Sequence, residues 1–111
     1  MPTSISRAAG QAMTKGLSRD LAKDNILVST VCIGLIKSGQ AERRLERMQA
    51  TKSEMTIEDV WAESVSGRAV PLGRMGESEE AGDVIAFLAS ERASYLTGIA
   101  VNIDGGSSAV L

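Results

Sequence analysis

Residues 26–33 place the strongest constraint on how this chain folds. They read Ile-Leu-Val-Ser-Thr-Val-Cys-Ile, a run rich in β-branched residues with no clean alternation of apolar and polar side chains. Such a run is typical of a parallel strand that is covered on both faces, because a strand with one solvated face alternates. Parallel strands also need a crossover connection, which is usually a helix. The run therefore predicts an α/β protein.

A helix is predicted just before this strand, over residues 4–23. Asp24 and Asn25 then give a turn signal that ends it. A helix in this position fits the crossover that a parallel strand requires. Its apolar residues recur at helical spacing and are Ile5, Ala9, Ala12, Met13, Gly16, Leu17 and Leu21.

The remainder of the chain predicts further helices and one more strand. Residues 40–49 are strongly charged and indicate a solvated helix. Thr56 followed by Asp59 is typical of the N-cap of a second helix. Ser78 begins a third helix, with acidic residues at its positive end, and residues 99–103 form a last short strand. The predicted order is helix, strand, helices, strand.

Two strands alone leave backbone edges unpaired and apolar faces uncovered. At about 25 cal/mol per Å², exposing a few hundred Å² of apolar surface costs several kcal/mol, which is comparable with the stability of a small domain. We therefore expect residues 1–111 to be a single partial domain. The missing strands would come from another copy, from a separate N-terminal polypeptide, or from a rearranged fold.

The composition excludes several function classes. The net charge is −2, the basic residues are scattered between acids, and only three residues are aromatic, so a nucleic-acid partner is not expected. The absence of His excludes a Ser-His-Asp triad or a His-ligated metal within these residues. Cys32 cannot form an internal disulfide, which favours the cytoplasm, and inside an apolar run it is predicted to be inert core. No apolar run is long enough for a membrane span, and no metal site is predicted.

The last third of the chain carries a specific order of short motifs. They are Val-Pro-Leu-Gly-Arg-Met-Gly at 70–76, Glu-Glu at 79–80, Phe-Leu-Ala-Ser at 87–90, Ser-Tyr-Leu-Thr-Gly at 94–98 and Asp-Gly-Gly at 104–106. This order resembles the C-terminal end of the short-chain dehydrogenase/reductases (SDRs), which are nicotinamide-dependent oxidoreductases. The resemblance implies the C-terminal part of a Rossmann-like, doubly wound parallel sheet. It also implies that the Gly-rich cofactor loop of the family would precede residue 1.

The same resemblance gives two catalytic positions, and both depart from the family pattern. Thr3 stands where the family has its catalytic Tyr, and Arg7 stands where it has the Lys. A Thr hydroxyl ionises with far more difficulty than a Tyr hydroxyl, and Arg does not shuttle protons. The resemblance leaves Arg7 a possible contact with cofactor ribose hydroxyls. The alternative for both residues is a solvated first turn of the helix.

Gly34, Ile36 and Ser38 fall where the family has Pro-Gly followed, four residues after the Gly, by Thr. Ile33 replaces the Pro. The resemblance implies that these three residues contact the nicotinamide of NAD or NADP, at the carboxyl end of a parallel strand. The alternative is a tight strand exit in which Gly34 supplies a conformation that other residues avoid.

Three functions follow as expectations. The first is a fragment of an SDR-type NAD(P)-dependent oxidoreductase that acts on a small-molecule alcohol or ketone and has little activity alone. It would work as a homo-oligomer or with the missing N-terminal half. The second is a non-catalytic assembly subunit of an SDR-like oligomer. The third, a truncated chain recruited to another reaction, has no residue cluster in its favour.

Overall fold

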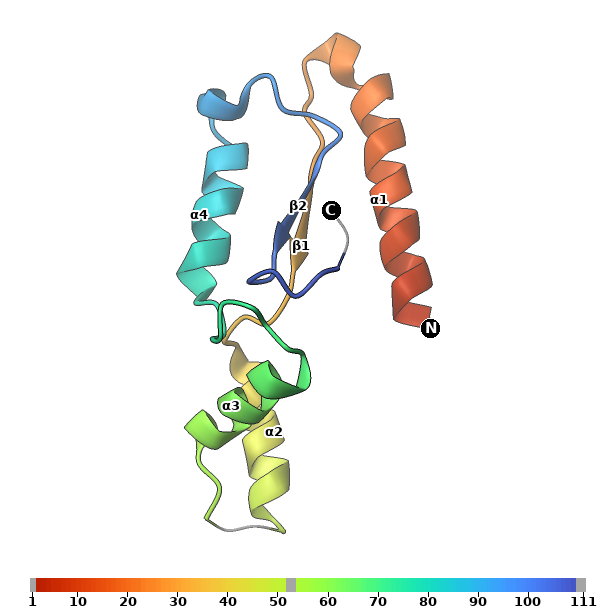
Figure 1. The fold of residues 1–111 in the computed structure, drawn as a ribbon. Helices are drawn as coiled ribbons and strands as arrows, with labels where there is room; N and C mark the ends of the chain where they lie inside the picture. The colour runs from red at the N-terminus through yellow and green to blue at the C-terminus, as the bar shows by residue number, and fades with distance from the viewer. Residues whose placement is uncertain (1, 52–53, 110–111) are drawn as a thin grey trace. The chain divides into compact units, whose positions relative to one another are not determined.

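The computed structural model describes residues 2–51 and 54–109, and its order of elements confirms the predicted one (Figure 1). The α-helices are α1 (Pro2–Asp20), α2 (Gly39–Gln49), α3 (Ile57–Gly67) and α4 (Ser78–Leu88), and the strands are β1 (Thr30–Ile33) and β2 (Ala100–Ile103). Short 3₁₀ turns lie at Ala22–Asp24 and Glu91–Ala93. The chain divides into two compact units. One takes the described residues up to Cys32 with Asp83–Val101, and the other takes Ile33–Gly82 with the described residues from Asn102 onward.

The two strands form a parallel sheet, as predicted. The Thr30 N–H donates to the Ile99 carbonyl at 2.9 Å, and the Gly34 N–H donates to the Ile103 carbonyl at 2.9 Å. The partners advance in the same direction along both strands, which is the parallel pattern. β1 begins later than the predicted residue 26, because the preceding residues bond to a loop instead. The Val28 N–H donates to the Thr97 hydroxyl at 3.0 Å.

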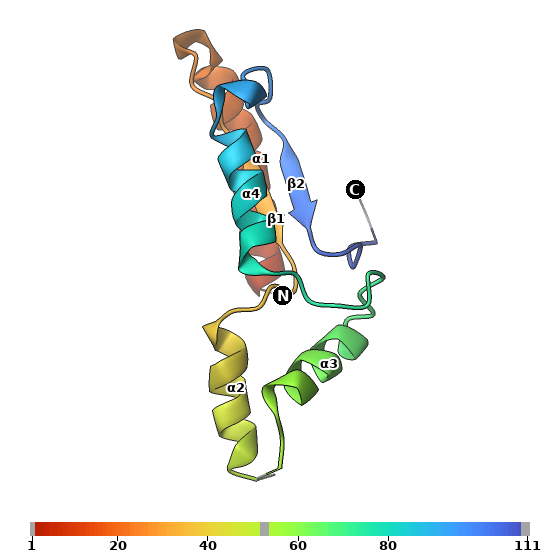
Figure 2. The same cartoon turned by 90° about the vertical axis from the view of Figure 1, so that its left-hand side faces the viewer.

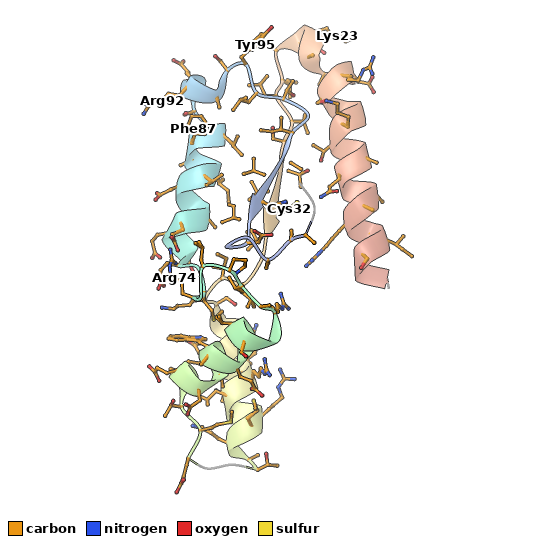
Figure 3. All side chains as sticks on the ribbon, in the orientation of Figure 1. Lys23, Cys32, Arg74, Phe87, Arg92 and Tyr95 are labelled. Atoms are coloured by element: carbon orange, nitrogen blue, oxygen red, sulfur yellow. The ribbon has the colours of Figure 1, made fainter. Side chains whose placement is uncertain are left out.

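Helix α1 contacts β1 through polar side chains. The Thr14 and Thr30 hydroxyl oxygens are 2.5 Å apart, and Gln11 Nε2 donates to Cys32 Sγ at 3.2 Å. Cys32 lies on β1 (Figure 3) and is half-buried. At about 100° per residue, positions 7, 11, 14 and 18 share one face of a helix. This is the face of α1 that meets the strand.

The predicted apolar stripe of α1 lies on the opposite side of the helix, and it is exposed. Ile5, Met13 and Leu17 are 66%, 63% and 39% exposed. The spacing predicted the helix correctly, but the apolar face is not the one that packs on β1. The second half of α4 lies on the other side of the strands from α1, so helices flank the sheet on both sides (Figures 1 and 2).

Although helices flank the sheet on both sides, the described residues cover β1 only in part. Val31 and Cys32 are only half-buried, and Ile33 is 47% exposed. Among the described residues, the buried apolar side chains are Val60, Val70, Met75, Ala81 and Ala93. That further strands come from elsewhere stays a prediction.

Helices α2 and α3 belong to the second unit and contact each other. Arg44 of α2 reaches Glu63 at 3.3 Å and the Ser64 hydroxyl at 3.2 Å on α3. The predicted N-cap is confirmed as a capping box, in which the Thr56 hydroxyl accepts from the Asp59 N–H while the Asp59 carboxylate accepts from the Thr56 N–H. The bond from the Thr56 N–H and, secondly, one that the Thr56 hydroxyl donates to the same carboxylate at 2.9 Å lower the pKa of Asp59. In the part of the chain that the structure describes, no helix has the length and apolar character needed to cross a bilayer.

Candidate functional site

The loop after β1 begins with a close backbone approach at Gly34. A Cβ on Gly34 would lie 2.6 Å from Asp104 Cβ and 2.7 Å from Asp104 Cα. Gly34 is not among the described residues with positive φ. The sequence alternative of a conformation reserved for glycine is therefore wrong. Gly34 is needed because the residues that follow β1 and β2 pass too closely for a side chain.

The next residues pair with the segment that leads into α4. Ile36 and Gly76 form an isolated parallel bridge. The Gly76 N–H donates to the Leu35 carbonyl, and the Lys37 N–H donates to the Gly76 carbonyl, both at 2.9 Å. These two bonds pair the Leu35 carbonyl and the Lys37 N–H, the backbone groups on either side of Ile36. They fix the position of the loop relative to Gly76.

Ser38 ends this loop as the N-cap residue of α2. Its backbone is extended, with φ −157° and ψ 163°, and its side chain makes no capping hydrogen bond. Ser38 is exposed. Among the described residues its hydroxyl has no hydrogen-bond partner, so it is free to donate to or accept from a ligand.

A cavity of about 430 Å³ lies within the second unit, beside the same loop. Its lining is mostly apolar and includes Leu35, Ile36, Pro71, Leu72, Gly76 and Gly105. Of the three residues predicted to touch a nicotinamide, only Ile36 lines this cavity. The structure thus places Gly34, Ile36 and Ser38 on one loop, with Gly34 packed against Asp104.

Two carboxylates next to this loop are held by hydrogen bonds. The Ser108 side chain and, secondly, the Gly106 N–H lower the pKa of Asp104. Arg74 grips Glu80 with two parallel bonds of 2.7 Å, and the Glu77 N–H donates to Glu80 at 2.8 Å (Figure 3 labels Arg74). The Arg74 bonds, followed by that of Glu77, lower the pKa of Glu80 to about 2. The sequence did not predict this pair, because Arg74 lies before α4 and Glu80 lies in its first turn, so no single helix or strand period relates them.

The Arg74–Glu80 pair predicts a pH dependence of stability. A carboxylate whose pKa falls on folding stabilises the folded state above its unfolded pKa, and this contribution disappears as the pH drops through the folded value. We expect Glu80→Gln to have a lower Tm than the wild type at pH 7. The difference should shrink below about pH 4.5 and vanish near pH 2. Thermal melts of both proteins across this pH range check the prediction. Glu79→Gln is the control, because among the described residues Glu79 makes no such pair with Arg74. A Tm difference that does not change with pH would contradict the assignment.

The two predicted catalytic positions lie on α1. The side chain of Thr3 lies outside the described residues. Arg7 is exposed, one turn before Gln11 on the helix face that meets β1. The register of Thr14 with Thr30 and of Gln11 with Cys32 runs toward the carboxyl end of β1, so Arg7 continues the row in that direction. No cluster of three or more potential metal ligands occurs among the described residues.

Comparison with known proteins gives a consistent result along almost the whole chain. A family model described as Enoyl-(Acyl carrier protein) reductase matches residues 2–108. Oxidoreductase UcpA of Salmonella typhimurium is 34% identical over 104 residues, covering 94% of this chain and 37% of the relative. The 3-oxoacyl-[acyl-carrier-protein] reductase FabG of Thermotoga maritima is 37% identical over 101 residues, covering 91% of this chain and 35% of the relative.

Solved structures agree with the sequence relatives. The apo structure of a short-chain oxidoreductase from Pseudomonas aeruginosa, described as containing an atypical catalytic center, superposes with a TM-score of 0.86 at 32% identity. It covers 98% of this chain and 41% of that one. L-sorbose reductase from Gluconobacter frateurii, solved with NADPH and L-sorbose, gives a TM-score of 0.84 at 29% identity, covering 96% of this chain and 40% of that one. The chain spans well under half the length of these relatives. With its flanked parallel strands and its matching motif order, it belongs to the short-chain dehydrogenase/reductase family.

Proposed function

We propose that this chain forms the nicotinamide-side portion of an SDR oxidoreductase that uses NAD or NADP to interconvert a small-molecule alcohol and ketone. The main support for this proposal is the position of Gly34, Ile36 and Ser38 on one loop at the carboxyl end of β1. Ligands bind at this end of the strands in open α/β sheets. Structural neighbours support the cofactor class. The P. aeruginosa oxidoreductase was also solved with NADPH, at a TM-score of 0.81, and the G. frateurii reductase holds NADPH with its sugar.

The residues of this loop fit a nicotinamide. The Ser38 hydroxyl is exposed and lacks a partner among the described residues, so it can hydrogen-bond a carboxamide or a phosphate oxygen. Ile36 offers an apolar side chain, and its backbone is held in place by Gly76. Bound nicotinamide supplies or accepts a hydride. This loop orients the ring, while the remaining phosphate contacts come from segments other than residues 1–111.

The catalytic positions support binding better than proton transfer. Arg7 carries several N–H donors, which suits ribose hydroxyls but not acid–base work. Thr3 replaces an ionisable Tyr. We therefore propose that proton transfer depends on groups outside this chain and that the 111-residue protein turns over little by itself. Steady oxidation of NADH or NADPH by the pure protein with a carbonyl substrate would refute this last point.

Dinucleotide binding is tested by thermal shift on the protein purified from its own cells with any partner it retains. A ligand at 100 times its Kd stabilises the folded form by about 2.7 kcal/mol, which raises Tm by roughly 10 °C for a chain of this size. We expect NADH or NADPH to raise Tm and ATP to have little effect. Ser38→Ala should reduce the shift, while the exposed Ser66→Ala on α3 should not. No shift with either dinucleotide would contradict the proposed cofactor.

A second candidate, a non-catalytic assembly subunit, is favoured by the exposed apolar stripe of α1. Ile5, Met13 and Leu17 are large apolar side chains that are exposed along this helix, and a row of exposed apolar residues is typical of an interaction surface. We propose that this stripe packs against another copy or against a full-length SDR chain. Met13→Lys should then shift the sedimentation profile toward monomer, with Ala62→Lys at an exposed position of α3 as the control. A stable monomer at micromolar concentration would contradict association.

A further inference from the structure

Lys37 is held by contacts from two separate segments of the second unit. Its Nζ lies 2.5 Å from Glu77 Oε1 and 4.5 Å from the centroid of the Trp61 ring on α3. The Ser78 hydroxyl donates to the Lys37 carbonyl at 3.0 Å. Only 33% of the Lys37 side chain is exposed, so this ammonium is not a freely solvated surface charge.

Trp61 and Glu77 are far from Lys37 in the sequence, but both contact its ammonium. An exposed ion pair alone contributes little, because solvent screens it and two long side chains lose freedom. Here the same ammonium also faces an aromatic ring, which attracts cations through its negative face. Trp61 Nε1 is buried and has no acceptor among the described residues, so its own hydrogen bonding does not fix the ring.

The backbone explains why anchoring Lys37 affects its neighbours. Residues 36–38 run extended along Gly76, and in an extended chain successive side chains point to opposite sides. Holding Lys37 on one side therefore turns Ile36 and Ser38 to the other. These two residues are the proposed nicotinamide contacts.

We propose that Lys37 is a positioning residue: its contacts with Trp61 and Glu77 set the orientation of the loop that carries Ile36 and Ser38. This inference rests on the proposed function. The contact between Lys37 and Trp61 also joins α3 to that loop. A displacement of α3 would therefore change the positions of Ile36 and Ser38. The Lys37 ammonium contacts Glu77 and Trp61, so Lys37 acts on the cofactor through its neighbours Ile36 and Ser38.

The test uses the protein purified as for the thermal shift, with any retained partner, and three variants. Lys37→Met removes the charge and keeps the apolar stem, while Lys37→Arg keeps the charge and the ring contact. Lys23→Met, at an exposed lysine of the first unit (Figure 3), is the matched control. Trp61 is the only tryptophan in the sequence, so its emission reports the ring contact directly. Titrations with NADPH and NADH give the dinucleotide affinity, which reports whether Ile36 and Ser38 are correctly placed.

We expect Lys37→Met to change the Trp61 emission and to weaken dinucleotide binding by about three- to tenfold. Lys37→Arg should bind within about twofold of the wild type, and Lys23→Met should be unchanged. Wild-type binding with equally tight binding by Lys37→Met would overturn the positioning role and leave the proposed function standing. A wild type that binds neither dinucleotide would overturn both, even if the emission changes. Equal weakening by Lys37→Arg and Lys37→Met would also overturn the role, because charge and ring contact would then be irrelevant.

Discussion

Gly34→Ala is expected to lower the Tm of the protein by roughly 10 °C and to weaken dinucleotide binding. The new Cβ would lie 2.6 Å from Asp104 Cβ and 2.7 Å from Asp104 Cα, far inside van der Waals contact. Asp104 cannot easily move, because its carboxylate accepts the Gly106 and Ser108 N–H groups at 2.9 Å each. Overpacking of this kind costs about 1–3 kcal/mol or more, and each kcal/mol shifts Tm by about 4–8 °C in a chain of this size.

The matched control for this substitution is Gly82→Ala in α4. A Cβ at Gly82 meets no atom within 4 Å, and alanine is favoured over glycine inside a helix by about 0.5–1 kcal/mol. We expect Gly82→Ala to keep or raise Tm. Thermal and denaturant unfolding of both variants give the comparison. Equal stability of Gly34→Ala and the wild type would show that the backbone at Gly34 and Asp104 does not approach as closely as described.

Gly98→Ala is the other substitution with a large expected effect, and it should weaken the first unit. Gly98 has φ +67°, a conformation that costs about 1–2 kcal/mol for a residue with a side chain. The added Cβ would also collide with the Ser18 hydroxyl and lie 3.1 Å from Lys15 Cδ. Ser18 is only 2% exposed, so its hydroxyl has little room to turn away. We expect a total cost of about 2–3 kcal/mol.

Gly73→Ala separates the backbone cost of a positive φ from the cost of the collision with Ser18. Gly73 has nearly the same backbone angle, φ +68°, but a Cβ there meets no atom within 4 Å. It should therefore show the backbone cost alone, and the excess of Gly98→Ala over it measures the collision with Ser18. Chemical denaturation of each variant checks this. The double variant Ser18→Ala with Gly98→Ala should recover part of the excess; no excess at all would mean that α1 does not pack on the loop at Gly98.

Local signals in the sequence predicted the elements well. The helices, the parallel strands and the capping box of Thr56 and Asp59 follow from patterns within a few residues, and the structure confirms them. The turn at Asn25 is confirmed by its left-handed backbone, φ 57°. The motif order of the last third indicated the family, and the comparisons confirm it.

The candidate site was predicted only in part. The sequence indicated the loop of Gly34, Ile36 and Ser38, but it did not reveal that Gly34 is required by Asp104, seventy positions later. Nor did it indicate Lys37. The partners of that ammonium, Trp61 and Glu77, lie on other elements, and no period within one element relates them.

The sequence by itself determined which segments are helix or strand, because propensity, caps and periodicity act between near neighbours. Only the tertiary structure decided which face of each element is used. On α1 the apolar stripe predicted the helix, yet the polar row of Gln11 and Thr14 is what meets β1. The physical reason is that a face packs on whatever surface the other elements present, and that surface is built from residues distant in the chain.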